Sequence, residues 1–168
     1  MCSSDLTVRR DLVGWRVLIT GASRGIGREL ALMAASAGAR VLATGRDESA
    51  LVELSEQVAK SGDDCRHLAG DITCPDFRST LIHHAENTLG GLDGLVNNAG
   101  VGTWNHVSAG DEATFRSIME TNFFAPVELI RAALPLLKLG RKPAILNVSS
   151  RCGRCALPSW TEIGRAHV

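Results

Sequence analysis

Short apolar runs and longer stretches of helical periodicity alternate along the whole chain. The run RVLIT at residues 16–20 is rich in aliphatic side chains and stops at a glycine, as a buried strand does. The next stretch spaces Ile26, Leu30 and Met33 along one face of a helix and ends at Gly38. The same pattern predicts strands at 16–20, 40–45, 65–70, within 92–100 and within 143–150, and helices at 26–38, 47–61, 75–89 and 111–139.

This alternation predicts an α/β fold. Helices of this length between strands imply a Rossmann-type doubly wound parallel sheet, with right-handed crossovers and helices on both faces. The 168 residues, of which 45% are hydrophobic, suit one domain with a sizeable core. The sequence contains no internal repeat, low-complexity tract or interdomain linker.

The charge balance and the apolar runs exclude several function classes. Eighteen basic and eighteen acidic side chains give zero net charge, so nothing favours nucleic acid or an acidic membrane as a partner. Polar residues interrupt each apolar run before it could span a bilayer, and residues 1–12 lack the apolar core of a signal peptide. The five cysteines are irregularly spaced, which favours reduced thiols. A cytoplasmic protein is predicted.

The segment TGASRGIG, residues 20–27, lies between the first predicted strand and the first predicted helix. Gly21, Gly25 and Gly27 allow a tight turn and a close approach of the backbone to a phosphate. The N–H groups and the dipole of the following helix favour the negative charge. The alternative is a glycine-rich turn that only joins a strand to a helix.

Five motifs occur in order along the chain: TGASRGIG, Asp71 in GDIT, NNAG at 97–100, Asn122, and NVSS at 147–150. Together they resemble the short-chain dehydrogenase/reductase (SDR) family over residues 15–161, which implies an NAD(P)-binding Rossmann domain, taken as residues 7–161. The resemblance implies that Asn97 mainly ties neighbouring strands together. The implied cofactor-binding residues are Gly21, Ala22, Ser23, Arg24, Gly25, Ile26, Gly27, Asp71, Ile72, Asn98, Ala99 and Gly100.

Charges at the end of the second predicted strand favour NADP(H) over NAD(H). An NAD enzyme of this type places a carboxylate there for the ribose 2′-hydroxyl, whereas this chain has Gly45 followed by Arg46, with Arg24 in the glycine loop. Arginine forms charge-assisted, often bidentate bonds to phosphate, which suits a 2′-phosphate. The nearby Asp47 is better explained as a helix cap. The alternative is that both arginines are solvated surface charges.

The resemblance implies two catalytic residues. Ser150 matches the family's serine, whose hydroxyl polarises the substrate carbonyl, while Ser149 is expected to face the packed sheet. Asn122 matches the family's asparagine, whose main-chain carbonyl holds a water of the proton relay. Pro126 has no N–H, so the carbonyl four residues earlier loses its helical partner and a kink is predicted. A kink that only helps Pro126 to pack is the alternative.

No metal site is predicted. Cys152 and Cys155 form a C-x-x-C pair, but zinc needs about four ligands and the sequence has no second pair. Trp104 and Trp160 flank the expected pocket, where they would either shape it or be ordinary partly buried aromatics.

The last residues depart from the family pattern. The resemblance places a catalytic Tyr-x-x-x-Lys motif at positions occupied here by Ile163 and His167, and the sequence contains no tyrosine. Isoleucine cannot donate a proton. Residues 1–6 and 162–168 resemble the translation of sequencing-library adaptor DNA, so both ends are expected to be non-native. The alternative is a non-catalytic NADP-binding sensor with a degenerate active site.

These features predict an N-terminal SDR fragment, truncated after the fifth strand. Its parent would be an NADP-dependent oxidoreductase that transfers a hydride between the nicotinamide and a small carbonyl or secondary-alcohol substrate. The fragment itself is expected to be inactive. The resemblance also implies a homodimeric or homotetrameric parent that associates through the helix at 111–139.

Overall fold

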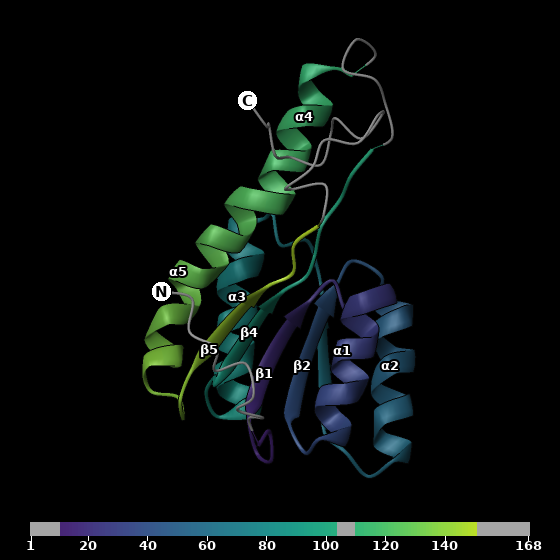
Figure 1. Ribbon diagram of the computed structural model, residues 1–168, viewed down its shortest axis with the longest axis vertical. Coiled ribbons are helices and arrows are strands. Elements are labelled where there is room, and N and C mark those ends of the chain that lie inside the picture. The colour runs from purple at the N-terminus through teal and green to yellow at the C-terminus, as the bar shows by residue number, and fades with distance from the viewer. Residues whose placement is uncertain (1–10, 104–109, 151–168) are drawn as a thin grey trace, which may run out of the picture.

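The computed structural model describes residues 11–103 and 110–150, in which helices alternate with the strands of one parallel sheet (Figure 1). The strands are β1 (Arg16–Thr20), β2 (Arg40–Gly45), β3 (Cys65–Ala69), β4 (Gly94–Asn97) and β5 (Ala144–Asn147). The helices are α1 (Gly25–Ser36), α2 (Glu48–Lys60), α3 (Pro75–Leu89), α4 (Glu112–Met119), the π-helical turn η2 (Glu120–Phe124) and α5 (Ala125–Lys138). The strand order β3-β2-β1-β4-β5, with each pair parallel, confirms the predicted Rossmann-type fold.

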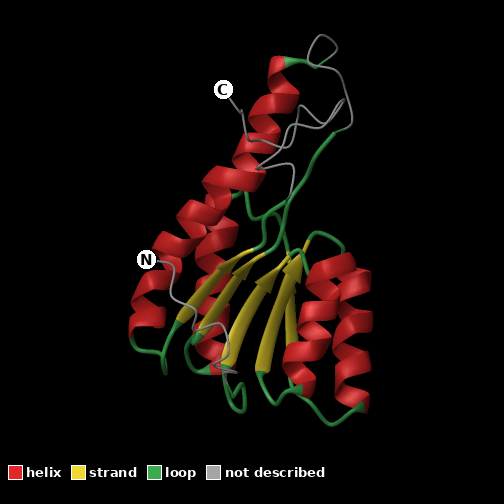
Figure 2. Ribbon diagram, viewed as in Figure 1, coloured by secondary structure: helices red, strands yellow, loops and turns green. Residues whose placement is uncertain are grey.

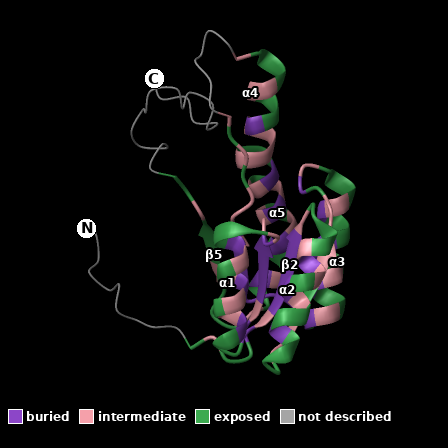
Figure 3. Cartoon of the chain, turned by 90° about the vertical axis from the view of Figure 1, so that its right-hand side faces the viewer, coloured by how far each residue is buried: buried purple, intermediate pink, exposed green. Residues whose placement is uncertain are grey.

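The inner strands β1 and β2 have buried apolar residues at consecutive positions because helices cover both faces of the sheet (Figure 2). Successive side chains of a strand point to opposite faces. Val17 and Ile19 of β1 belong to the core beneath α1 and α2, whereas Leu18 belongs to the core beneath α3 and α5. The sheet is thus the buried middle layer of three (Figure 3).

Most helix ends fall where the sequence predicts them. Asp47 caps α2 by accepting a hydrogen bond from the backbone N–H of Ala50 at 3.1 Å, and Asp111 caps α4 in the same way, at 2.7 Å from Thr114. These backbone hydrogen bonds lower the pKa of both carboxyl groups. Pro75 opens α3, where its missing N–H costs nothing. None of the helices in the described ranges has the length and apolar character needed to cross a membrane.

The helix predicted at 111–139 is not a uniform α-helix. Between α4 and α5 the backbone forms the π-helical turn η2, and the N–H of Ala125 bonds to the carbonyl of Glu120, five residues earlier. Pro126 follows in the first turn of α5 and cannot donate the bond that an α-helix would send to Asn122. The predicted break is therefore accommodated by a wider turn, of the kind that often occurs at functional sites. This places Asn122 inside η2.

A buried carboxylate joins three segments at the edge where the strands begin. The side chain of Asp93, just before β4, is fully buried. Its Oδ2 accepts from Arg16 Nε at 2.8 Å, and its Oδ1 accepts from Arg16 Nη2 at 2.8 Å and from the backbone N–H of Arg141 at 2.6 Å. The hydrogen bonds from Arg16 are the main reason that the pKa of Asp93 lies well below its usual range. One carboxylate thus connects the starts of β1 and β4 with the turn before β5.

β5 is an outer strand of the described sheet. It pairs with β4 on one side, and its side chains Ile145 and Leu146 are 40% and 51% exposed. An outer strand with exposed aliphatic side chains is an edge that further structure or another chain can cover.

Candidate functional site

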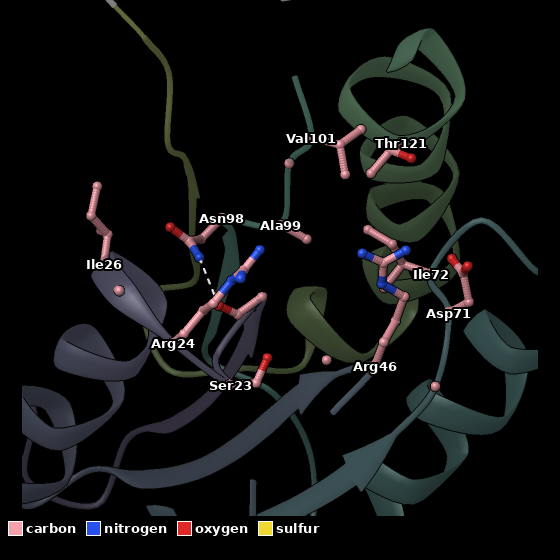
Figure 4. Close-up of a pocket in the computed structure, with 15 residues that line it drawn as sticks. Ser23, Arg24, Ile26, Arg46, Asp71, Ile72, Asn98, Ala99, Val101 and Thr121 are labelled. Carbon is pink, nitrogen blue, oxygen red and sulfur yellow. Dashed lines mark hydrogen bonds between the residues drawn. The ribbon is translucent and has the colours of Figure 1, made fainter. Parts of the chain in front are cut away.

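The carboxyl ends of β1 to β4 surround a cavity of about 320 Å³, shown with its lining residues in Figure 4. Open α/β sheets bind ligands at this edge. Of the residues that the sequence assigns to the cofactor, all line the cavity except Ala22 and Gly27, which are buried. The structure also places Gly70, Val101 and Thr121 in its wall, which the sequence interpretation missed. Each is adjacent to an assigned residue, so sequence proximity was the available signal.

The glycine loop needs glycine for two different reasons. Gly21 and Gly25 adopt φ angles of 65° and 56°, a region that side chains disfavour. Gly27 lies in α1, and a Cβ there would overlap the carbonyl of Gly21 and the side-chain amide of Asn98. Gly27 therefore does not line the cavity, but its lack of a side chain allows the loop to fold back over the start of the helix.

Replacing Gly27 with alanine is expected to lower the free energy of unfolding by about 1–3 kcal/mol, because the added methyl group has no room. Gly25→Ala is the matched control, since a Cβ there meets no atom within 4 Å and only the backbone is strained, at a cost of about 1 kcal/mol. Urea unfolding of the two variants gives the comparison. A loss at Gly27 no larger than that at Gly25 would contradict the close packing.

Two arginines face the cavity from neighbouring loops. Arg24 precedes α1 and Arg46 follows β2; both are exposed, and Figure 4 shows their side chains on either side of the space. Between them, β2 ends at Gly45, which brings no carboxylate to this point, and a Cβ there would lie 2.9 Å from the Ser23 hydroxyl. The next acid along the chain, Asp47, caps α2 as predicted.

The start of α1 is suited to bind an anion. α1 has no acidic residue in its first turn, whereas α2, α3 and α4 have Glu48, Asp76 and Glu112 at the corresponding place. An acid in the first turn would neutralise the partial positive charge of the helix end. Its absence leaves the N–H groups and dipole of α1 directed at the cavity, where a pyrophosphate would fit.

Asp71 and Ile72 form the opposite wall, after β3. Asp71 Oδ1 accepts from the backbone N–H of Thr73 at 2.9 Å and from its hydroxyl at 2.8 Å. The backbone bond is the largest cause of the lowered pKa of Asp71, with a smaller contribution from the positive charge of Arg46. Asp71 is therefore an anion held in place beside the cavity.

The two asparagines after β4 have different hydrogen-bond partners. Asn97 Nδ2 donates to Asn147 Oδ1 at 2.9 Å and so ties β4 to β5, as predicted. Asn98 Nδ2 donates to the carbonyls of Thr20 and Gly21, at 3.0 and 3.1 Å. Asn98 lines the cavity, but its amide also holds the glycine loop.

A second cavity, of about 500 Å³, adjoins the first and shares five lining residues with it, including Asn98 and Val101. Asn122 and Ser150, the two predicted catalytic residues, both line this second cavity. Asn122 Oδ1 accepts from the N–H of Val101 at 2.9 Å, and its Nδ2 donates to the carbonyl of Val101 at 2.8 Å. The side chain of Asn122 thus fixes the loop that separates the cavities, a role that the sequence interpretation did not include.

The expected orientation of Ser149 is wrong. Ser149 is exposed and lines the same cavity as Ser150, because the chain leaves the sheet after Asn147 and no longer packs between helices.

Several other sequence-based predictions lie outside the described residues, namely those on Trp104, Cys152, Cys155, Trp160, Ile163 and His167. Within the described ranges, no group of three or more His, Cys, Asp or Glu side chains could hold a metal ion. Cys65 and Cys74 are free thiols, and burial raises the pKa of Cys65 to about 11.

Comparisons with known proteins agree with this geometry. The family model for short chain dehydrogenases matches residues 16–162. The chain is 34% identical over 160 residues to the oxidoreductase YxnA of Bacillus subtilis. This alignment covers 87% of this chain and 45% of YxnA. It is 35% identical over 143 residues to the 3-oxoacyl-[acyl-carrier-protein] reductase FabG of Vibrio cholerae, covering 85% of this chain and 57% of FabG.

Solved structures give the same result. A structure from Sinorhizobium meliloti described as a short-chain alcohol dehydrogenase superposes with a TM-score of 0.86 at 35% identity, covering 92% of this chain and 61% of that one. A short chain dehydrogenase structure from Pseudomonas syringae superposes with a TM-score of 0.85 at 34% identity, covering 92% and 65%. The chain spans about half the length of the curated relatives that it matches. It belongs to the short-chain dehydrogenase family.

Proposed function

We propose that this chain is the cofactor-binding portion, residues 7–161, of an NADP-dependent oxidoreductase. The whole protein would transfer a hydride between the nicotinamide and a small carbonyl or secondary-alcohol substrate. The observation that carries the cofactor choice is the end of β2, where Gly45 stands in place of an acid and Arg24 and Arg46 line the cavity. A 2′-phosphate between Arg24 and Arg46 would receive charge-assisted hydrogen bonds from both.

The first cavity would bind the cofactor, and the second would bind the substrate. The N–H groups at the start of α1 would bind the pyrophosphate, and Asp71 and Ile72 would contact the adenine. The bound nicotinamide supplies or accepts the hydride. Ser150 would orient the substrate oxygen from the second cavity and stabilise its developing negative charge. Asn122 would hold the loop at Val101 in place and, through its main chain, a water of the proton relay.

The whole protein is proposed to be a homodimer or homotetramer that associates through α4 and α5. The observation behind this is apolar exposure at η2, where Phe123 and Phe124 are 51% and 50% exposed. Their rings meet edge to face, with centroids 5.2 Å apart. Exposed aromatic side chains that pack together are typical of protein interfaces.

A non-catalytic NADP sensor is the second candidate. It would hold if Ile163 and His167 were native, because they stand where the family resemblance places the proton donor and its lysine. The sensor would use the same cofactor cavity without the chemistry, so a binding measurement cannot separate the two candidates, whereas a turnover measurement can.

The 168-residue chain is expected to bind NADPH at least about tenfold more tightly than NADH, since one charge-assisted phosphate contact is worth roughly that factor. Arg46→Asp should abolish or reverse the preference by placing a carboxylate where the phosphate would lie. Titration calorimetry with both nucleotides measures the ratio.

Arg131→Asp is the matched control for this substitution. Arg131 is an exposed arginine on α5 that pairs with Glu128 and lines neither cavity. The Arg131→Asp variant should therefore have the same affinities for NADPH and NADH as the unmodified chain. Equal affinities of the unmodified chain for NADPH and NADH would refute the proposed cofactor preference.

A further inference from the structure

Arg78 is a buried arginine in the first turn of α3, only 8% exposed. Its Nη1 donates to the carbonyls of Ile72 and Thr73, at 2.7 and 2.9 Å. In the part of the chain that the structure describes, no carboxylate lies within ion-pair distance of its guanidinium. A buried cation costs free energy, and one near a helix N-terminus also opposes the helix dipole. Stability alone is therefore a poor reason for an arginine at this position.

The two carbonyls belong to the loop that forms one wall of the cofactor cavity. Asp71 and Ile72 line the cavity, whereas Arg78 does not and lies behind them. The loop is also held at its other end, because Gly70 packs against the ring of Phe77 so closely that a Cβ on Gly70 would overlap the ring. Phe77 and Arg78 thus fix residues 70–73 from the cavity's outer side, and the Asp71 carboxylate accepts from Thr73 within the same loop.

We propose that Arg78 is a positioning residue for the adenine end of the cofactor cavity. By binding the carbonyls of Ile72 and Thr73, its guanidinium holds Asp71 and Ile72 in the conformation that an adenine requires before the nucleotide arrives. A wall that is already ordered loses less conformational entropy on binding, so affinity rises without a direct contact. The inference rests on the proposed function, because it assigns the adenine to this wall.

The proposal makes a specific prediction about nucleotide affinity. NADPH and NADH share the adenine, and Arg78 does not reach the 2′-phosphate site between Arg24 and Arg46. Arg78→Met should therefore weaken both nucleotides by the same factor, about tenfold, and leave their ratio unchanged. Arg78→Lys should recover most of the loss, because an ammonium can still donate to both carbonyls.

Arg40→Met is the matched structural control. Arg40 donates from Nη1 and Nη2 to the carbonyls of Leu89 and Thr88 at the other end of α3, at 2.8 and 2.9 Å. Like Arg78, it donates to two consecutive carbonyls, but these lie at the end of α3 away from the cavity wall, and its Nε also pairs with Asp64. The Arg40→Met substitution should lower the melting temperature and leave the affinities for both nucleotides unchanged.

The test is calorimetric titration of the 168-residue chain and these variants with NADPH and NADH, with melting temperatures measured on the same samples. An unchanged affinity of Arg78→Met would overturn the proposal, as would a loss confined to NADPH or a lysine variant as weak as the methionine one. If Arg78→Met does not fold, Gly70→Ala replaces it, because this variant disturbs the same loop from its other end. Gly70→Ala must then lower the affinities for NADPH and NADH by the same factor, and unchanged affinities would overturn the proposal. Failure of the unmodified chain to bind either nucleotide would instead refute the proposed function.

Discussion

Asp93→Ala is expected to lower the free energy of unfolding by about 3–5 kcal/mol, because it breaks a buried ion pair. The side chain is fully buried and accepts hydrogen bonds from two segments of the chain besides its own. Its removal leaves the Arg16 guanidinium, whose side chain is only 21% exposed, without its charge partner. Urea unfolding at neutral pH measures the loss.

Asp64→Ala is the control for this substitution. Asp64 also pairs with two arginines, Arg40 and Arg66, but its side chain is 33% exposed and water can replace it. A loss of about 1 kcal/mol or less is expected there. Equal losses at Asp64 and Asp93 would show that burial does not determine the strength of the Asp93 contacts.

The same carboxylate predicts how stability depends on pH. The pKa of Asp93 is lower in the folded chain than in the unfolded one, where it is about 4. Its contribution is therefore fully present above pH 4 and decreases as the pH falls below that value, because the unfolded state then binds the proton more readily. Between about pH 5 and pH 3, at constant ionic strength, the free energy of unfolding should fall less for Asp93→Asn than for the unmodified chain.

The 168-residue chain is expected to bind NADPH but to show no hydride transfer. Ile163 and His167 stand at the positions of the family's tyrosine and lysine, and isoleucine cannot donate a proton to the substrate oxygen. General acid catalysis alone contributes about two to four orders of magnitude to such a rate. The measurement follows the absorbance of the reduced nicotinamide with a panel of aldehydes and ketones.

Two further proteins complete the turnover experiment. The double variant Ile163→Tyr with His167→Lys should also be inactive. The chain spans about half the length of its curated relatives, and we expect the remaining half to supply the walls that hold a substrate close to the nicotinamide. The chain joined after Thr161 to the corresponding segment of a relative should turn over. If that joined protein binds NADPH but stays inactive, the sensor is favoured; turnover by the unmodified chain would contradict the interpretation of residues 162–168.

The fold was predictable because several independent sequence signals agree at each element. β1 has apolar residues at consecutive positions, as expected of a strand buried on both faces, and Asp47 and Pro75 mark helix starts by local chemistry alone. Most of the cavity residues were inferred from the family resemblance. The topology explains why they line one cavity: parallel strands bring their following loops, with Gly21, Arg46 and Asp71, to one edge of the sheet.

The features that the sequence did not predict depend on how the segments pack together. Pro126 indicates that a helical hydrogen bond is missing, but not that a π-helical turn replaces it. Asn122 looks like one residue of a motif, and its two bonds to Val101 depend on where η2 meets the loop after β4. Arg78 lies in a polar helix, where an arginine is expected to be solvated, and only the packing of α3 shows that it is buried.

The strand order has a consequence for how the chain folds during synthesis. β3, β2 and β1 are neighbours in sequence and in the sheet, but the other edge of β1 pairs with β4, which is made only after β2 and β3 and the helices that follow them. At about 5–20 residues per second, the ribosome leaves that edge of β1 unpaired for several seconds. During this interval the apolar run at residues 16–20 is open to the strands of other nascent chains, and chaperones that shield such edges should determine how much protein a cell accumulates.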